Sequence, residues 1–292
     1  MTISNTAFLA ADTGASSMGD GGLHYAMKGI DDSYERLDEL LAKMEKEMFR
    51  RERLENERLL NELSEAQTIQ ASLLPRHPAD VSTFSLTGAC LPCRAVGGDW
   101  YDYLQLPDGR VAVVLADVSG KGMGAALLMS STRSILRLIA YDGRSPAEVL
   151  GRVNAVLLDD FPAARFVTMV YALLDPQKRS VVLANAGHLP PLLVEATSAS
   201  FLETAEGLPL GIHESNFSER MIQMPPGSRL VLCSDGVTEA SNSSMEEYGL
   251  ARVQEHFSRS GSSLESLLDE VRDFSAGNPP SDDATVVVLE AR

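Results

Sequence analysis

The feature that most limits how this chain can fold is a change of pattern at residues 75–78. From Asp31 to Leu74 the sequence contains neither glycine nor proline, and Pro75 and Pro78 then follow closely. Proline lacks a backbone N–H and clashes with the preceding helical turn, so these two residues mark the end of a helix. The sequence therefore predicts a long helix over residues 31–75, followed by a domain of a different kind.

The apolar residues of this helix form a narrow stripe. They follow a 4-3-4 spacing in two runs, the first Leu37, Leu41, Met44 and Met48 and the second Leu59, Leu63, Ala66 and Ile69 or Gln70. A basic cluster at Arg50, Arg51 and Arg53 separates the two runs. A narrow stripe is typical of helices that pair with another helix. We expect a regulatory, coiled-coil-like helix that forms a homodimer or contacts a partner. The alternative is a single helix lying on the domain that follows it.

The rest of the chain divides into two parts. Residues 1–30 are rich in serine, threonine, glycine and alanine, and we expect a flexible N-terminus there. In residues 76–292, short apolar segments alternate with turns such as Pro107-Asp108-Gly109. Helical patterns occur in pairs, near 125–139 and 146–158 and again near 251–257 and 264–274. Hairpins in series with paired helices predict an α+β fold in which helices cover antiparallel sheets.

Composition excludes several classes of function. The formal net charge of −16 would repel a nucleic-acid backbone. The longest strongly apolar stretch, Val111–Ala116, is far shorter than the roughly 20 residues of a membrane span. The N-terminus shows no basic leader followed by an apolar core, and three cysteines do not make a disulfide framework. We expect a cytoplasmic protein that binds neither nucleic acid nor a membrane.

Aspartates stand at the ends of several predicted strands. Asp117 follows the apolar run VAVVLA, and Asp235 follows RLVLCS. Asp282 and Asp283 precede ATVVVLE, and Asp99 precedes WYDYL. Carboxylates that converge at one edge of a pair of sheets are costly to desolvate unless a cation neutralises them. Ligands that are all oxygen atoms favour hard cations such as Mg²⁺ or Mn²⁺ over zinc.

The motifs that contain these aspartates also carry a resemblance to a known family. They follow one another in the order VGGDWYD, LADVSGKGMGAAL, NAGHLPP, CSDGVTEA and SDDATVVV. Together they resemble the SpoIIE/RsbU-type serine/threonine phosphatases, the bacterial branch of the metal-dependent type 2C (PPM) superfamily. The preceding stretch, EAQTIQASLLP, is similar to the junction between helix and domain in that family. The resemblance covers about residues 65–289.

The resemblance implies a four-layer αββα sandwich of two antiparallel sheets flanked by helices, with two Mn²⁺ or Mg²⁺ ions at one end. It implies that Asp117 bridges both ions and that the backbone carbonyl of Val118 is a further ligand. Asp235 and Asp282 match the aspartates on one ion, and Asp99 matches the acidic position that serves the other directly or through water. Asp102 and Asp283, each near a better match, are weaker candidates.

The same resemblance implies a reaction and a partner. The two ions share a water, and the hydroxide formed from it attacks the phosphorus of a phosphoserine or phosphothreonine. The implied substrate is a phosphorylated STAS-type anti-sigma-factor antagonist in a partner-switching signalling pathway. The alternative is a catalytically silent PPM-fold binding module that signals through its N-terminal helix. It is disfavoured because all four aspartate positions are filled.

Three further residues are candidates for handling the substrate phosphate. Arg94 lies five residues before Asp99, and Lys121 lies in the glycine-rich turn after Asp117, so either could reach a phosphate; each is more often a solvated surface residue. His188 is a candidate general acid, although a structural role in its turn is more usual.

Two rival motifs fail on their spacing or context. Gly120-Lys121-Gly122 is not a nucleotide-binding loop, because a glycine stands where GxxxxGK[ST] needs serine or threonine. Cys90 and Cys93 have the spacing of a redox pair. They lack both the βαβ context of such a pair and the four ligands of a structural zinc site.

Overall fold

The computed structural model describes residues 20–75, 79–160, 165–196, 198–203 and 207–292. The chain divides into two compact units, Met1–Asn61 and Glu62–Arg292. Helix α1 (Asp20–Leu73) begins ahead of the predicted start at Asp31. The glycines that made an earlier start unfavourable each cost a helix only about 1 kcal/mol, so they lower its stability without excluding it. The first 19 residues of the predicted flexible N-terminus lie outside the described residues.

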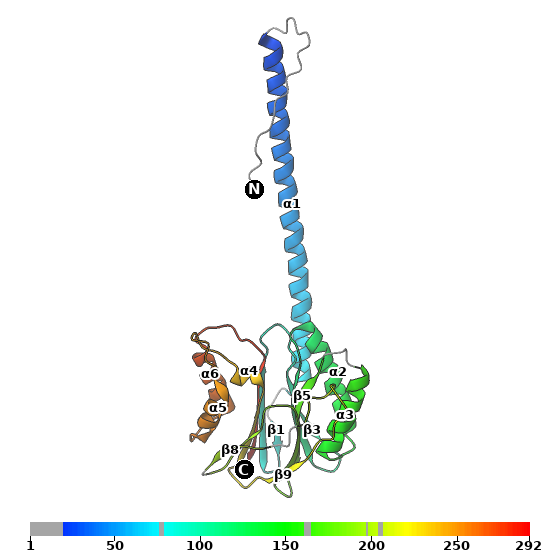
Figure 1. Ribbon diagram of the computed structural model, residues 1–292, viewed down its shortest axis with the longest axis vertical. Coiled ribbons are helices and arrows are strands. Elements are labelled where there is room, and N and C mark those ends of the chain that lie inside the picture. The colour runs from blue at the N-terminus through cyan, green and yellow to red at the C-terminus, as the bar shows by residue number, and fades with distance from the viewer. Residues whose placement is uncertain (1–19, 76–78, 161–164, 197, 204–206) are drawn as a thin grey trace. The chain divides into compact units, whose positions relative to one another are not determined.

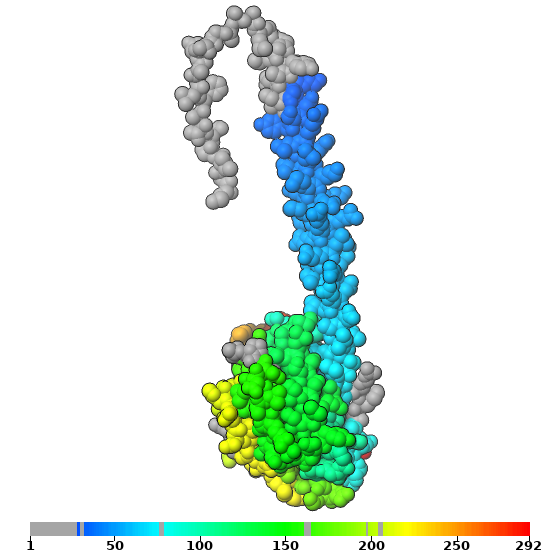
Figure 2. Space-filling model, turned by 90° about the vertical axis from the view of Figure 1, so that its right-hand side faces the viewer, coloured from blue at the N-terminus to red at the C-terminus, as the bar shows by residue number. Residues whose placement is uncertain are grey.

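In the first unit, the side chains of residues 32–61 of α1 are exposed (Figure 2, blue). The apolar stripe predicted from the sequence is part of this uncovered surface. Leu37 and Leu41 are 50% and 49% exposed, and Met44 and Met48 are more exposed still. Among the described residues, no helix is long and apolar enough to cross a membrane.

Two antiparallel sheets form the centre of the second unit (Figure 1). In spatial order, the first sheet contains β1 (Ala79–Val81), β2 (Phe84–Leu91), β11 (Ala284–Ala291), β10 (Arg229–Cys233), β7 (Leu192–Val194) and β8 (Ala199–Phe201). The second contains β3 (Trp100–Gln105), β4 (Val111–Val118), β5 (Val167–Asp175), β6 (Ser180–Ala186) and β9 (Arg220–Gln223).

Helices cover the outer face of each sheet. The second sheet packs against α2 (Met123–Ala140) and α3 (Pro146–Asp160), which form the green face in Figure 2. The first sheet packs against α4 (Asp235–Thr238), α5 (Gly249–Ser258) and α6 (Leu264–Phe274). Three apolar cores result, one between the sheets and one under each helical layer. The expected four-layer αββα sandwich is confirmed.

The apolar run of β4 is explained by its place in these layers. Val113 and Leu115 face the core between the sheets, whereas Val114 and Ala116 face the core under α2 and α3. A strand that is buried on both faces needs apolar residues at every position, so the usual alternation with polar residues is absent. The run stops at Asp117, where the strand reaches the end of the sheet.

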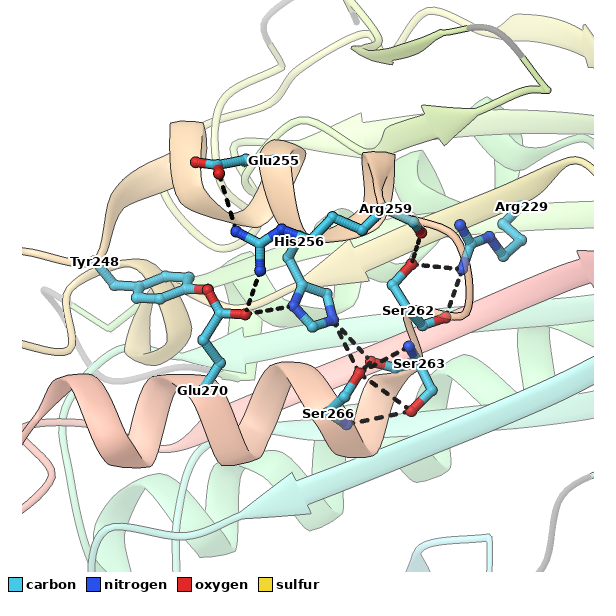
Figure 3. Close-up of polar contacts among 9 residues, drawn as sticks. All are labelled: Arg229, Tyr248, Glu255, His256, Arg259, Ser262, Ser263, Ser266 and Glu270. Atoms are coloured by element: carbon cyan, nitrogen blue, oxygen red, sulfur yellow. Dashed lines mark hydrogen bonds and ion pairs between the residues drawn. The ribbon is translucent and has the colours of Figure 1, made fainter.

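The outer helices α5 and α6 are joined by a polar network (Figure 3). The buried imidazole of His256 contacts Glu270 Oε2 through Nδ1 at 2.8 Å and Ser266 Oγ through Nε2 at 3.1 Å. Ser263 and Ser266 form a capping box at the start of α6. Tyr248 Oη donates a hydrogen bond to Glu270 Oε1 at 2.9 Å. The network fixes α6 against α5 on the outside of the first sheet.

Candidate metal and phosphate site

The sheet register brings the strand ends that carry aspartates to one edge of the sandwich. In the second sheet, Trp100 pairs with Ala116, which places Asp99 and Asp117 at neighbouring strand ends. In the first sheet, Cys233 pairs with Val286, so the segment after β10 meets the segment before β11. Asp235 and Asp282 lie on these two segments.

Close backbone packing joins the two sheets at this edge. A Cβ atom on Gly98 would lie 2.5 Å from the carbonyl oxygen of Val118 and 3.3 Å from Oδ1 of Asp117. A Cβ atom on Gly97 would overlap the carboxylate of Asp283. The two glycines therefore allow the loop before Asp99 to pass between Asp117 and Asp283, which no larger residue would permit without a shift of the backbone.

The carboxylate of Asp283 anchors this loop. It is only 3% exposed, and it accepts backbone N–H groups from Cys93 and Gly98 at 2.8 Å each and from Asp99 at 3.4 Å. Its oxygens are thus engaged in holding the loop that carries Asp99. This support role had been left open by the sequence, in which Asp283 is adjacent to Asp282.

The carboxylates of the cluster repel one another in a poorly hydrated environment. Burial, and then the charge of Asp117, raises the pKa of Asp99 well above its ordinary value; Thr285 Oγ1 donates to Asp99 Oδ2 at 2.6 Å. Burial and the charge of Asp235 raise the pKa of Asp117 to about 7. Burial and the charge of Asp282 raise the pKa of Asp235. Either protonation of these carboxyl groups or a nearby positive charge relieves this repulsion.

Lys121 supplies part of that charge. Its ammonium Nζ lies 2.7 Å from Oδ2 of Asp282 and also donates to the carbonyl oxygen of Ser281. The hydrogen bond to Asp282 raises the pKa of the Lys121 ammonium. The pKa of Asp117 is raised in spite of this cation. The cluster, with the adjacent carbonyl oxygen of Val118, offers the hard oxygen donors that suit a divalent cation.

The two nearby cysteines do not have the properties of a redox pair. The Cys93 sulfur and the carboxylates of Asp282 and Asp283 lie within 4.8 Å of one another. Burial, and then the charge of Asp283, raises the pKa of the Cys93 thiol to about 11, and burial also raises that of Cys90. Raised pKa values favour the protonated thiols near neutral pH, whereas disulfide exchange needs thiolates.

Asp102 contacts arginines and not the other aspartates of the cluster. Its buried carboxylate pairs with Arg133 at 3.0 Å and with Arg137 at 2.7 Å, both on α2. Asp102 therefore fastens α2 to β3.

Two arginines flank the glycine-rich turn that follows Asp117. Nη1 of Arg94 would lie 3.7 Å from a Cβ atom on Gly122. Nη1 of Arg165 donates to the carbonyl oxygen of Ser119 at 2.5 Å, and its guanidinium lies against Gly120. Arg165 is absent from the sequence-based candidates because it lies 46 positions from Ser119 and outside every quoted motif.

The contacts of His188 hold it in its turn, as expected for a structural role. Its Nδ1 contacts Thr168 Oγ1 at 2.8 Å, and its backbone N–H and carbonyl are both held by the Asn185 side chain. Burial lowers the pKa of the imidazole to about 4, so it is neutral near pH 7 and a poor proton donor.

The last turns of α1, which belong to the second unit, contact the loop that carries Asp99. Gln70 Nε2 donates to the carbonyl oxygen of Gly97 at 2.7 Å, and Gln70 Oε1 accepts the N–H of Gly97 at 3.0 Å. From the sequence, either Ile69 or Gln70 could be the last residue of the apolar stripe. The pair of hydrogen bonds fixes one side of the loop, and Asp283 fixes the other.

Comparisons with known proteins identify the family of the chain. A family model described as Stage II sporulation protein E (SpoIIE) matches residues 107–292. Protein IcfG of Synechocystis sp. is 28% identical over 260 residues, which cover 78% of this chain and 41% of IcfG. Phosphoserine phosphatase RsbU of Bacillus subtilis is 29% identical over 242 residues, which cover 80% of this chain and 70% of RsbU. The chain thus spans less than half the length of IcfG.

Solved structures share the fold. The RsbU and RsbW domains of Rv1364c from Mycobacterium tuberculosis match with a TM-score of 0.63 and 28% identity, over 73% of this chain and 61% of that one. The SiaA-PP2C domain of Pseudomonas aeruginosa matches with a TM-score of 0.73 over 81% of this chain and 98% of that one. At 19% identity, the second match bears on the fold alone.

Proposed function

Because the chain belongs to the SpoIIE family, we propose that it is a metal-dependent protein phosphatase that acts on phosphoserine or phosphothreonine in a partner protein. The observation that carries the proposal is the convergence of Asp99, Asp117, Asp235 and Asp282 at one edge of the sandwich. The name of RsbU, phosphoserine phosphatase, supports the same reaction.

The four aspartates and the Val118 carbonyl are the proposed ligands of two Mn²⁺ or Mg²⁺ ions. Asp117 would serve both ions, Asp235 and Asp282 one of them, and Asp99 the other. Bound there, such ions supply an activated water that they share and offset the charge of the phosphoryl oxygens. RsbX, which shares the fold, has been crystallised in complex with magnesium.

The chain's own cations would orient the phosphate. Arg94 and Arg165 flank the turn after Asp117, and a planar guanidinium can bind two phosphate oxygens at once. Lys121 pairs with Asp282, a proposed ligand. If Asp282 held a cation, the Lys121 ammonium would be available to bind a phosphate oxygen at the same turn.

The proposed substrate is a phosphorylated STAS-type anti-sigma-factor antagonist in the cytoplasm, and the proposed assembly is a homodimer through α1. The uncovered apolar stripe of residues 37–48 supports the dimer. The contact between Gln70 and Gly97 supports control of activity by α1, because the helix end touches the loop that presents Asp99. Deleting residues 1–60 should change both the oligomeric state and turnover; if neither changes, the regulatory role is wrong.

The first experiment measures phosphate release from a phosphoserine peptide with Mn²⁺ and with EDTA, for the wild type and Asp117→Asn. We expect release that depends on Mn²⁺ and falls at least about 100-fold in the variant, since loss of a charged group at the reacting centre costs about 3 kcal/mol or more. Mn²⁺ binding without release from any phosphoserine or phosphothreonine substrate would instead favour the silent binding module.

A further inference from the structure

An apolar groove lies beside the candidate site. It has a volume of about 290 Å³, at the lower end of the range for ligand sites. One wall is α6, with Leu268 and Val271, and the opposite wall contains Leu91 and Pro92 at the end of β2. The 277–281 loop, with two adjacent prolines, completes the groove. Leu91 is 53% exposed, so its side chain is accessible from the groove.

Residues that line the groove are direct chain neighbours of two aspartates of the candidate site. Gly236 lines the groove and directly follows Asp235, and Ser281 lines it and directly precedes Asp282. The backbone at Gly236 packs so tightly on residues 282–283 that a Cβ atom there would overlap the Asp283 carbonyl. Ser234 Oγ donates to that same carbonyl at 3.1 Å. Two of the proposed ligands therefore stand at the end of the groove on a rigid backbone.

We propose that this groove binds an apolar side chain of the phosphoprotein substrate, within about three residues of the phosphorylated serine or threonine. The chain neighbours of Asp235 and Asp282 line the groove, and an extended substrate chain advances about 3.3–3.6 Å per residue. A substrate whose phosphate lies at the aspartates can therefore place a neighbouring side chain in the groove. The inference rests on the proposed phosphatase function and adds to it a requirement for apolar residues next to the phosphate.

The chemistry of the groove favours an apolar occupant over a charged one. Leu91, Pro92, Leu268 and Val271 line it, together with the partly buried Ala240 and Ala284. Arg272 lies at its margin and is already paired with Asp269 at 2.5 Å. A groove of this kind discriminates side chains by apolar area, at about 25 cal/mol per Å² removed from water.

The test uses two phosphoserine peptides of equal length and charge, with leucine or alanine at the three positions on each side of the phosphoserine. We expect the wild type to have a kcat/KM about tenfold higher for the leucine peptide, and Leu91→Ser and Leu268→Gln to remove most of this preference. Hydrolysis of para-nitrophenyl phosphate, which has no flanking chain, should be unchanged. Leu208→Ser is the matched control, because Leu208 is 50% exposed and lies outside the groove.

A binding measurement separates this proposal from the proposed function. In the Asp117→Asn background, fluorescence anisotropy of the labelled peptides reports docking without turnover. Tighter binding of the leucine peptide that is lost with Leu91→Ser supports the groove, even if no phosphate is ever released. Equal affinity for both peptides overturns it, as does an equal effect of Leu208→Ser. A change of molar mass in the Leu91→Ser variant would make a second copy of the chain the occupant, which also overturns it.

Discussion

Asp117 contributes unfavourably to the stability of the protein when no cation is bound, because its carboxylate is buried beside other carboxylates. We expect Asp117→Asn to raise the free energy of unfolding in EDTA by about 1 kcal/mol, equivalent to about 2–4 °C in melting temperature for a domain of this size. In Mn²⁺ the order should reverse, because the wild type gains binding energy that the variant lacks. Thermal unfolding in both buffers measures the effect.

The exposed Asp142 provides the control for this prediction, since it pairs with Arg144 at the surface. Asp142→Asn should change the melting temperature by less than about 1 °C in either buffer. If Asp117→Asn is the less stable protein in EDTA as well, the carboxylate stabilises the fold through its hydrogen bonds, and the repulsion argument fails.

The surrounding sequence predicted the structural position of some aspartates but not of others. Asp117 and Asp235 follow apolar runs, and the end of such a run predicts the end of a buried strand. Asp283 had no distinguishing signal, because only the folded chain brings Cys93 and Gly98 to its carboxylate. Arg165 was missed for the same reason, because only the folded chain brings its guanidinium to the carbonyl oxygen of Ser119.

The C-terminal turns of α1 are hydrogen-bonded to the loop that carries Asp99 through Gln70. Gln70→Ala removes both hydrogen bonds to Gly97, so the loop that carries Asp99 loses its support on that side. We expect the affinity for Mn²⁺ to fall about tenfold, since reordering the loop on binding would cost about 1.4 kcal/mol. Titration calorimetry measures the affinity. The control is Gln67→Ala, at an exposed glutamine one turn earlier; equal losses in both variants would exclude a specific role for Gln70.

The contact between α5 and α6 predicts a dependence of stability on pH. Hydrogen bonds to Glu270, first from His256 and then from Tyr248, lower the pKa of its carboxyl below the ordinary 4.5 (Figure 3). A carboxyl with a lowered folded pKa stabilises the protein above its unfolded pKa, and this contribution is lost as the pH falls through the folded pKa. As the pH is lowered through 4.5, the free energy of unfolding should therefore fall more steeply for the wild type than for Glu270→Gln.

Urea unfolding over a series of pH values measures both slopes. Glu255→Gln is the matched control, because Glu255 also pairs with Arg259 but is well exposed and does not contact His256. Its slope should equal that of the wild type. Parallel slopes for the wild type and Glu270→Gln would mean that the network does not favour the ionised carboxyl.

The sequence pattern predicted that residues 76–292 contain many strands. It did not predict which strands pair with one another. The run Val111–Ala116 indicated a strand buried on both faces, which the cores on its two sides explain. The neighbours of β11 are β2 and β10, and β2 lies almost 200 residues earlier in the chain. Local pattern contains no information about such a pairing, whereas the family resemblance does. Local propensity was also misleading at the start of α1. The helix begins at Asp20, although the residues there disfavour a helix.

In the part of the first unit that the structure describes, the stripe is an apolar surface that no other described residue covers. Leu37, Leu41, Met44 and Met48 are each about half exposed or more, and a helix of this kind is stabilised when a second helix packs on the stripe. We expect the full chain to be a dimer by light scattering at micromolar concentration, and residues 62–292 alone to be a monomer.

Substitution within the stripe tests the same idea in the intact chain. Replacing both Leu41 and Met48 with glutamate buries two charges per helix in the pair, which costs several kcal/mol and should give a monomer. The matched control replaces Ala42 and Phe49 with glutamate, because these exposed residues have the same spacing but lie outside the stripe, so the dimer should persist. If the Leu41 and Met48 variant stays dimeric, the dimer contact lies elsewhere; if the wild type is a monomer, the stripe does not mediate self-association.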